Sequence, residues 1–333
     1  MATITPRAAE DGTGTGLTRA VAGLPPVSFF LVSAIFHYLG PSLAVLLFAH
    51  IAALGVMWLR IASAAVVFAV WRRPWRLAGR LDRRQRVMLV ALGGVLAGMN
   101  ALFYLAVARL PLATVGAIEF LGSIVLAALG ARTRRNAAAL ALTVAGVAAL
   151  TAIRVMGRPL GFLFAFGNCA GFTLYVILGH RVANTRVTGA TGGRGDGEAV
   201  AAGIDQLGAA MLIAAVGAVP AGLAAALPAF THPAWLAWGI GVGVCSSVIP
   251  YVADQLAMAR LPRASFALML ALLPAFAAIT GAVVLGQIPT GRDLAGIVLV
   301  IAGVAIHRTD AGRPEGPAAG TPLRCRWQKP ARR

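Results

Sequence analysis

Residues 105–114 read LAVARLPLAT and residues 256–265 read LAMARLPRAS, so two distant segments agree at seven of ten positions with an offset of 151. A second echo, AGVA at 145–148 and again at 302–305, keeps the same order at an offset of 157. Chance is a poor explanation for two ordered matches. The chain is therefore predicted to consist of two related halves.

The composition indicates that both halves lie in a membrane. Of the 333 residues, 59% are hydrophobic and only 12% are charged, which leaves too little charged surface for a soluble enzyme. A membrane-spanning helix needs roughly 20 mostly apolar residues. Ten windows meet this need, and the predicted spans are 27–48, 49–70, 87–108, 111–130, 136–153, 160–179, 204–225, 235–256, 264–285 and 291–307.

The predicted fold is an all-α integral membrane protein with ten transmembrane helices in two inverted five-helix repeats. The repeated segment closes the third span in one half and the eighth in the other, so each half holds five spans and the halves have opposite orientation. Inverted repeats are typical of secondary transporters. The predicted domains are a disordered tail at 1–26, repeats at 27–153 and 160–307, and a disordered basic tail at 308–333.

The basic residues predict the orientation, because positively charged loops stay in the cytoplasm. With both termini cytoplasmic, 24 of the 29 basic residues fall in cytoplasmic segments, and Arg109, Arg154, Arg158 and Arg292 lie outside. The net charge of +18 is spread between apolar runs rather than along one face, so the lipid bilayer is the expected partner and nucleic acid is not. We expect a multi-pass protein of the cytoplasmic (inner) membrane.

Charged side chains inside the predicted spans are the first candidates for a site, since each costs about 2.5–3.5 kcal/mol near the bilayer centre. They are Arg60 in the second span, Glu119 in the fourth and Asp254 in the eighth. For Arg60 and Glu119, a buried structural ion pair competes evenly with a role in transport. For Asp254, an interfacial salt bridge with the nearby Arg260 and Arg263 is the simpler interpretation.

Uncharged polar residues of the spans can line the same cavity, although a lone polar residue more often bonds a neighbouring helix. Proline breaks add free backbone carbonyls that can turn toward a ligand, and Pro250 is one such break. The offset of 151 makes Asn100 and Tyr251 symmetry mates. The polar candidates are Asn100, Tyr104, Asn168, Tyr175, Ser246, Ser247 and Tyr251.

Two segments carry a resemblance to a known family. GMNALFYLAVARLPLATVGAIEFLG at 98–122 and SSVIPYVADQLAMARLP at 246–262 resemble the EamA family of the drug/metabolite transporter superfamily, most closely its threonine/homoserine exporters. The resemblance covers about residues 27–307, and it implies ten helices and proton-linked export of small metabolites, amino acids included. Carried onto matching positions, it points to substrate-binding or translocation roles for Arg60, Asn100, Tyr104, Glu119, Pro250, Tyr251 and Asp254.

Two positions depart from this family pattern. Leu273 stands where such exporters place a glutamate before the proline of the ninth span, here Pro274. The span then ends Leu285-Gly286-Gln287, where they read Leu-Gly-Glu. If one of these two family glutamates carries the proton or recognises the substrate amine, then proton coupling or the substrate differs in this chain, which lacks both.

The sequence thus predicts a secondary transporter that exports a small polar metabolite, such as threonine or homoserine, by proton antiport. Glu119 would carry the proton or hold the substrate ammonium, and Arg60 would hold the substrate carboxylate or keep Glu119 ionised. An exporter of another solute (a drug-like cation or a sugar derivative), a non-coupled channel and a membrane scaffold remain alternatives. No enzyme motif, cofactor motif or metal-ligand spacing is present, so neither an enzyme nor a cofactor is expected.

Glycine pairs at a spacing of four predict close helix packing, within the chain or in a homodimer. The pairs are Gly94/Gly98, Gly167/Gly171 and Gly239/Gly243.

Overall fold

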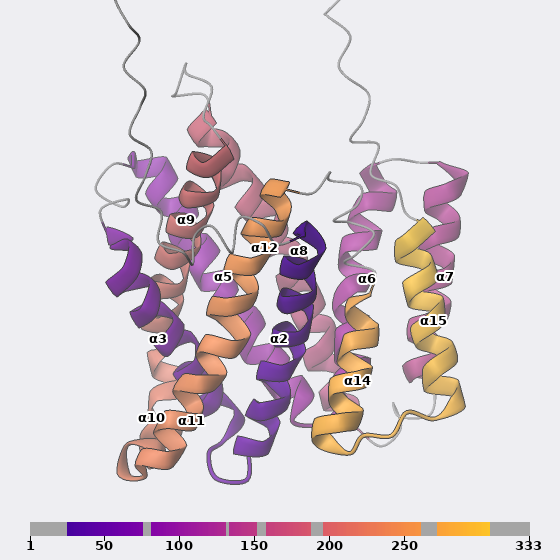
Figure 1. Cartoon of the computed structure of the whole chain (residues 1–333). Coiled ribbons are helices and arrows are strands. Elements are labelled where there is room, and N and C mark those ends of the chain that lie inside the picture. Colours follow the sequence, from indigo (N-terminus) through magenta and orange to yellow (C-terminus); the bar gives the residue numbers. More distant parts are fainter. Residues whose placement is uncertain are drawn as a thin grey trace, which may run out of the picture.

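The computed structural model describes residues 25–75, 81–130, 133–151, 158–187, 196–260 and 272–306, and every regular element in these ranges is helical (Figure 1). The helices are α2 (Pro26–Leu47), α3 (Ala53–Arg72), α5 (Arg83–Val107), α6 (Leu112–Gly130), α7 (Arg134–Thr151), α8 (Pro159–Val187), α9 (Asp196–Gly217), α10 (Val219–Thr231), α11 (Pro233–Gly243), a π-helical turn (Val244–Val248), α12 (Ile249–Arg260), α14 (Leu273–Leu285) and α15 (Gly291–Ile306).

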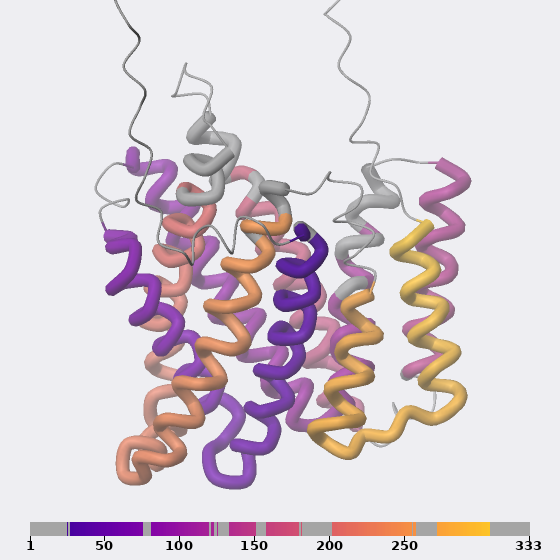
Figure 2. The backbone as a smooth tube through the Cα atoms, viewed as in Figure 1, coloured from indigo at the N-terminus to yellow at the C-terminus, as the bar shows by residue number. Residues whose placement is uncertain are grey.

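Length and composition identify the chain as a multi-pass membrane protein. Within the described residues, five helical stretches are long and apolar enough to cross a membrane, or six if one bent pair counts as a single span. The helices run side by side along a common direction in Figure 2. The predicted tails lie outside the described residues, apart from Pro25 and Pro26, at which α2 begins.

The predicted seventh span, 204–225, is not one straight helix. The chain bends by 82° between Gly217 and Val219, so α9 and α10 are separate elements. Pro220 is the second residue of α10. A proline has no N–H to continue the helix and its ring clashes with the carbonyl four residues earlier, which explains a break that hydropathy does not report.

The third predicted span also begins earlier than expected, at Arg83 rather than at residue 87. Asp82 forms a capping box with Gln85: the Asp82 carboxylate accepts from the Gln85 N–H at 2.7 Å, and the Asp82 N–H donates to Gln85 Oε1 at 3.2 Å. The cap satisfies amides that the first helical turn leaves free, so the helix extends into the charged segment.

Small residues set the closest helix contacts. Gly171 of α8 lies against Met99 of α5, and Gly243 of α11 lies against the Arg60 backbone of α3. These contacts confirm two of the three predicted glycine pairs as packing positions within the chain. Gly94 and Gly98 have nothing within 4 Å of where a Cβ would be, so they do not pack against another described helix.

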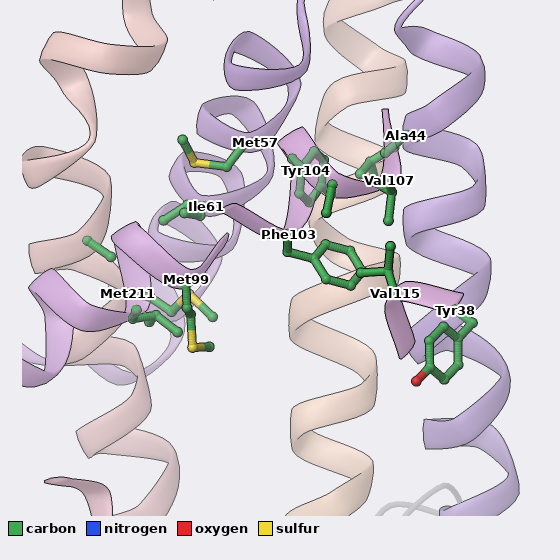
Figure 3. Packing of buried hydrophobic residues seen from close by; sticks show 14 of the residues in the cluster. Tyr38, Ala44, Met57, Ile61, Met99, Phe103, Tyr104, Val107, Val115 and Met211 are labelled. Carbon is green, nitrogen blue, oxygen red and sulfur yellow. The ribbon is translucent and has the colours of Figure 1, made fainter. Parts of the chain in front are cut away.

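The buried apolar side chains form one core between the helices. Figure 3 shows Phe103 and Tyr104 of α5 between Ile61 of α3 on one side and Tyr38 of α2 on the other. The α7/α15 pair, which packs lengthwise, lies to one side of this core (Figure 1). The α2–α3, α10–α11 and α14–α15 connections all lie at the lower end of the bundle in that view.

Candidate functional site

Arg60 of α3 lies at the centre of a polar cluster between helices, with 6% of its surface exposed. Its guanidinium donates three hydrogen bonds to two other parts of the chain. Nε donates to Ser247 Oγ at 3.0 Å and Nη2 to the Ser246 carbonyl at 3.1 Å, both in the π-helical turn. Nη1 donates to Asn100 Oδ1 of α5 at 2.9 Å. The cluster therefore joins α3, α5 and the middle of the eighth predicted span.

The π-helical turn and Pro250 explain why the Ser246 carbonyl is available to Arg60. Pro250 lies four residues after Ser246 and has no N–H, so it cannot make the usual helical hydrogen bond to that carbonyl. The turn Val244–Val248 follows the wider π pattern, which often occurs at functional sites. The predicted break at Pro250 thus supplies a backbone acceptor to the cluster.

Asn100 and Tyr104 occupy successive turns of the same face of α5. Asn100 Nδ2 donates to the Leu96 carbonyl at 2.8 Å, which leaves its Oδ1 directed at Arg60. The Arg60 Cζ lies 5.5 Å from the centroid of the Tyr104 ring, in the range of a cation–π interaction. These two predicted site residues therefore both contact Arg60.

The direct ion pair between Arg60 and Glu119 is not formed, so that structural interpretation is wrong. Among the described residues, no carboxylate oxygen lies within 4.0 Å of the Arg60 guanidinium, whereas Arg72 and Asp205 form an ion pair at 2.7 Å. Glu119 acts on Arg60 only as a more distant charge. Arginine keeps its charge in proteins, and a buried charge without a counter-ion is unfavourable. The cluster thus holds a positive charge that no described carboxylate contacts directly.

Glu119 of α6 is partly buried and faces α2 and α8. Gly116 and Gly122, one turn before and after it, lie against Tyr38 and Cys169. The side chain of Asn168 on α8 interacts with the Glu119 carboxylate. A carboxylate and a guanidinium therefore belong to one polar region without touching each other.

Three buried polar atoms around these charges have no hydrogen-bond partner within the described residues: Tyr38 Oη, Tyr104 Oη and Asn168 Nδ2. Tyr38 interacts electrostatically with Glu119, and Tyr104 Oη lies near Arg60 and Ser246 without a hydrogen bond of normal geometry. Buried polar atoms are rarely left unbonded. Their grouping indicates that water or a ligand completes the site.

Tyr251 and Asp254 extend the cluster along α12. Tyr251 interacts electrostatically with Arg60, Glu119 and Asp254. Asp254 interacts with the side chain of Ser33 on α2. The predicted salt bridges of Asp254 cannot be placed, since residue 263 lies outside the described residues and the Arg260 side chain is not described. Tyr175 joins the group through its interaction with Tyr251.

Sequence reasoning missed Tyr38 and Ser33 as members of this cluster. Both lie in the first predicted span, as isolated polar groups in an otherwise apolar run. Among the described residues, no three His, Cys, Asp or Glu side chains are grouped so as to hold a metal ion.

The two departures from the family pattern have different surroundings. Leu273 begins α14 and is buried in the apolar core. Gln287 follows Gly286, whose φ of +64° in the left-handed region favours glycine. Its Oε1 accepts from the N–H of Leu112, the first residue of α6, at 3.1 Å. Compared with the glutamates of the family pattern, Gln287 keeps a hydrogen-bond acceptor at the start of α6. Leu273 has no polar group in its side chain.

Comparisons with known proteins agree with this architecture. A model of the EamA-like transporter family matches residues 201–309. The threonine/homoserine exporter RhtA of Salmonella typhimurium (strain SL1344) is 32% identical over 293 residues, covering 86% of this chain and 92% of the relative. RhtA of Escherichia coli (strain K12) is 31% identical over 283 residues, covering 83% and 89%.

A protein of known crystal structure has the same fold, with a TM-score of 0.51 and 19% identity over 84% of this chain and 96% of that one. It supports the fold alone. The identity to the RhtA exporters extends over most of both chains. The chain therefore belongs to the EamA-like transporter family, which is a family of transporters and not of enzymes.

Proposed function

We propose that this protein is a secondary transporter of the cytoplasmic membrane, with ten spans in two inverted repeats at 27–153 and 160–307 and both termini in the cytoplasm. The internal repeat at an offset of 151 supports the inversion. The α2–α3, α10–α11 and α14–α15 connections lie at one end of the bundle, as alternating passes require. The distribution of arginines makes that end the outer one.

The exported solute is a small amino acid of the threonine/homoserine kind. The observation that carries this proposal is the buried Arg60, which has no carboxylate within 4.0 Å in the part of the chain that the structure describes. Asn100 and Ser246 each accept one N–H from its terminal nitrogens, so each of these nitrogens keeps a second N–H. Arginine binds carboxylates through two parallel N–H bonds. The solute carboxylate therefore supplies the counter-ion that the cluster lacks.

Glu119 carries the coupling proton or binds the solute ammonium. It lies in the same polar region as Arg60 without an ion pair to it, so its charge is free to change during the cycle. Proton antiport then follows from exchange of a proton for the ammonium at one carboxylate. Asn100 and Tyr104 position Arg60, Pro250 frees the Ser246 carbonyl, and Tyr251 and Asp254 continue the polar path along α12.

Uptake of radiolabelled threonine and homoserine into inside-out vesicles, with and without an inward-acidic pH gradient, tests this function. We expect saturable accumulation that depends on the gradient. Flux without saturation or counterflow would identify a channel instead, and absence of flux in vesicles that hold folded protein would remove these solutes.

The variant Glu119→Gln separates coupling from folding. It should abolish gradient-driven accumulation while leaving the protein folded, because glutamine cannot bind and release a proton. Asp205→Asn, which alters the partly exposed ion pair with Arg72, is the matched control and should retain coupling. Normal proton-driven flux in Glu119→Gln would exclude Glu119 from the coupling step.

A further inference from the structure

A cavity lies outside the Arg60 cluster, at the end of the bundle where α6 and α15 begin. Its volume is about 480 Å³, within the usual range for small-molecule sites. Its wall is formed by the connection between α5 and α6, the start of α8, and the segment between α14 and α15. Its polar lining residues are Arg109, Thr114, Arg158, Gln287 and Asp293.

The two arginines of this cavity are held in place by neutral groups. Arg109 Nη1 donates to the Leu105 carbonyl at 2.8 Å, and its Cζ lies 5.1 Å from the Phe164 ring centroid. Arg158 Nη1 donates to the Arg109 carbonyl at 2.6 Å. Neither guanidinium has a carboxylate oxygen within 4.0 Å among the described residues. Two oriented positive charges therefore line one cavity, and neither makes an ion pair within 4.0 Å with a described carboxylate.

The other polar groups of the cavity have defined acceptors and donors. Gln287 Oε1 accepts from Leu112 N–H at 3.1 Å, and Asp293 Oδ2 accepts from the Thr290 N–H and hydroxyl, both at 2.9 Å. Asp293 adds a negative charge to the lining. A cavity with two guanidiniums and one carboxylate suits a zwitterion better than a doubly charged anion.

We propose that this cavity is a second, release-side binding site, in which Arg109 and Arg158 bind the carboxylate of the exported amino acid. The proposal rests on the orientation and solute of the proposed function. Arginine is disfavoured in outer loops by the positive-inside rule. Arg109 and Arg158 are two of the four arginines predicted on the outer side. Binding of a carboxylate at this site would explain why arginines occur there. The solute would occupy it after leaving Arg60.

Cysteine protection at Ala113, a small residue that lines the cavity, tests the proposal. Ala113→Cys is labelled with a membrane-impermeant maleimide in intact cells and in inside-out vesicles. We expect labelling from the cell exterior, slowed in a saturable way by threonine and by acetate but not by threoninol, which lacks the carboxylate. Ala234→Cys, an exposed residue at the start of α11 outside the cavity, should label without protection.

Charge variants identify the groups that bind. Arg158→Gln, and Arg109→Gln with Arg158→Gln, should each raise the half-protecting threonine concentration about tenfold or more, the effect of one lost charged hydrogen bond. Arg158 is exposed, so the single variant keeps the test valid if the double variant does not fold. Arg292→Gln is the matched control, because Arg292 is an exposed arginine of the same end that does not line the cavity.

Four outcomes would overturn the proposal. In the first two, labelling of Ala113→Cys is slowed by neither threonine nor acetate, or is slowed equally in the arginine variants and the wild type. In the other two, protection by threonine is lost in Arg60→Gln, or only phosphatidylglycerol protects, which would assign the cavity to a lipid headgroup. Labelling from the cytoplasmic side would instead refute the orientation. Protection by acetate with no transport of threonine would leave this site standing and refute the proposed solute.

Discussion

Replacing Arg60 by lysine keeps the positive charge at the centre of the bundle but removes the planar guanidinium. Arg60 spreads three hydrogen bonds over Ser247, Asn100 and the Ser246 carbonyl, at 2.9–3.1 Å. A single ammonium nitrogen cannot occupy the positions of Nε, Nη1 and Nη2 together. Lysine also cannot offer the parallel pair of N–H groups that a carboxylate binds. The substitution therefore separates charge from geometry.

The magnitude follows from the bonds lost. A hydrogen bond to a charged group contributes about 1.5–3 kcal/mol, so loss of one bond to the solute weakens its binding roughly ten- to hundredfold. Each acceptor that lysine leaves unbonded lowers the free energy of unfolding by about 1–3 kcal/mol. We expect the KM for threonine to rise by that factor and the thermal midpoint to fall.

Uptake kinetics in inside-out vesicles and thermal unfolding of the solubilised protein measure the two effects separately. Arg72→Lys is the matched control, since the Arg72–Asp205 pair is partly exposed and such pairs contribute only about 0.2–1 kcal/mol. It should leave KM unchanged. A folded Arg60→Lys variant with the wild-type KM would show that Arg60 holds helices together and does not bind the solute.

Two further substitutions, and a matched control for the second, test how the cluster is assembled. Pro250→Ala restores an N–H that can bond the Ser246 carbonyl, so Arg60 loses an acceptor. The KM measured by vesicle uptake should rise by up to about tenfold. An unchanged KM would contradict the role given to Pro250. Gly243→Ala places a Cβ against Ser63 Oγ and 2.7 Å from the Arg60 carbonyl, so the free energy of unfolding should fall by about 1–3 kcal/mol. Gly98→Ala, with nothing within 4 Å, should stay within about 1 kcal/mol of wild type in the same unfolding assay. Equal effects at the two glycines would show that helix packing is not the cause.

Hydropathy located most helices because lipid burial depends on apolar residues that are consecutive in sequence. The predicted spans 27–48 and 111–130 match α2 and α6 closely. Hydropathy did not predict the bend between Gly217 and Val219, because the residues on both sides of the bend are equally apolar. Helix continuity there depends on a missing N–H rather than on hydrophobicity.

Site membership was predictable where a polar residue is costly in a membrane. Arg60, Asn100 and Tyr104 come together as predicted positions. Tyr38 was missed, because a tyrosine in an apolar run is equally consistent with packing, and only the approach of α6 at Gly116 brings it near Glu119.

By itself, the sequence determined that this is an all-helical membrane protein and that charged residues lie within its apolar segments. The tertiary structure alone decided which groups those charges meet. Arg60 bonds Ser246 and Ser247, which are 186 and 187 residues away, and not Glu119. The reason is that hydropathy depends only on residues that are consecutive in one helix, whereas the partners of a side chain depend on how several helices are rotated and packed.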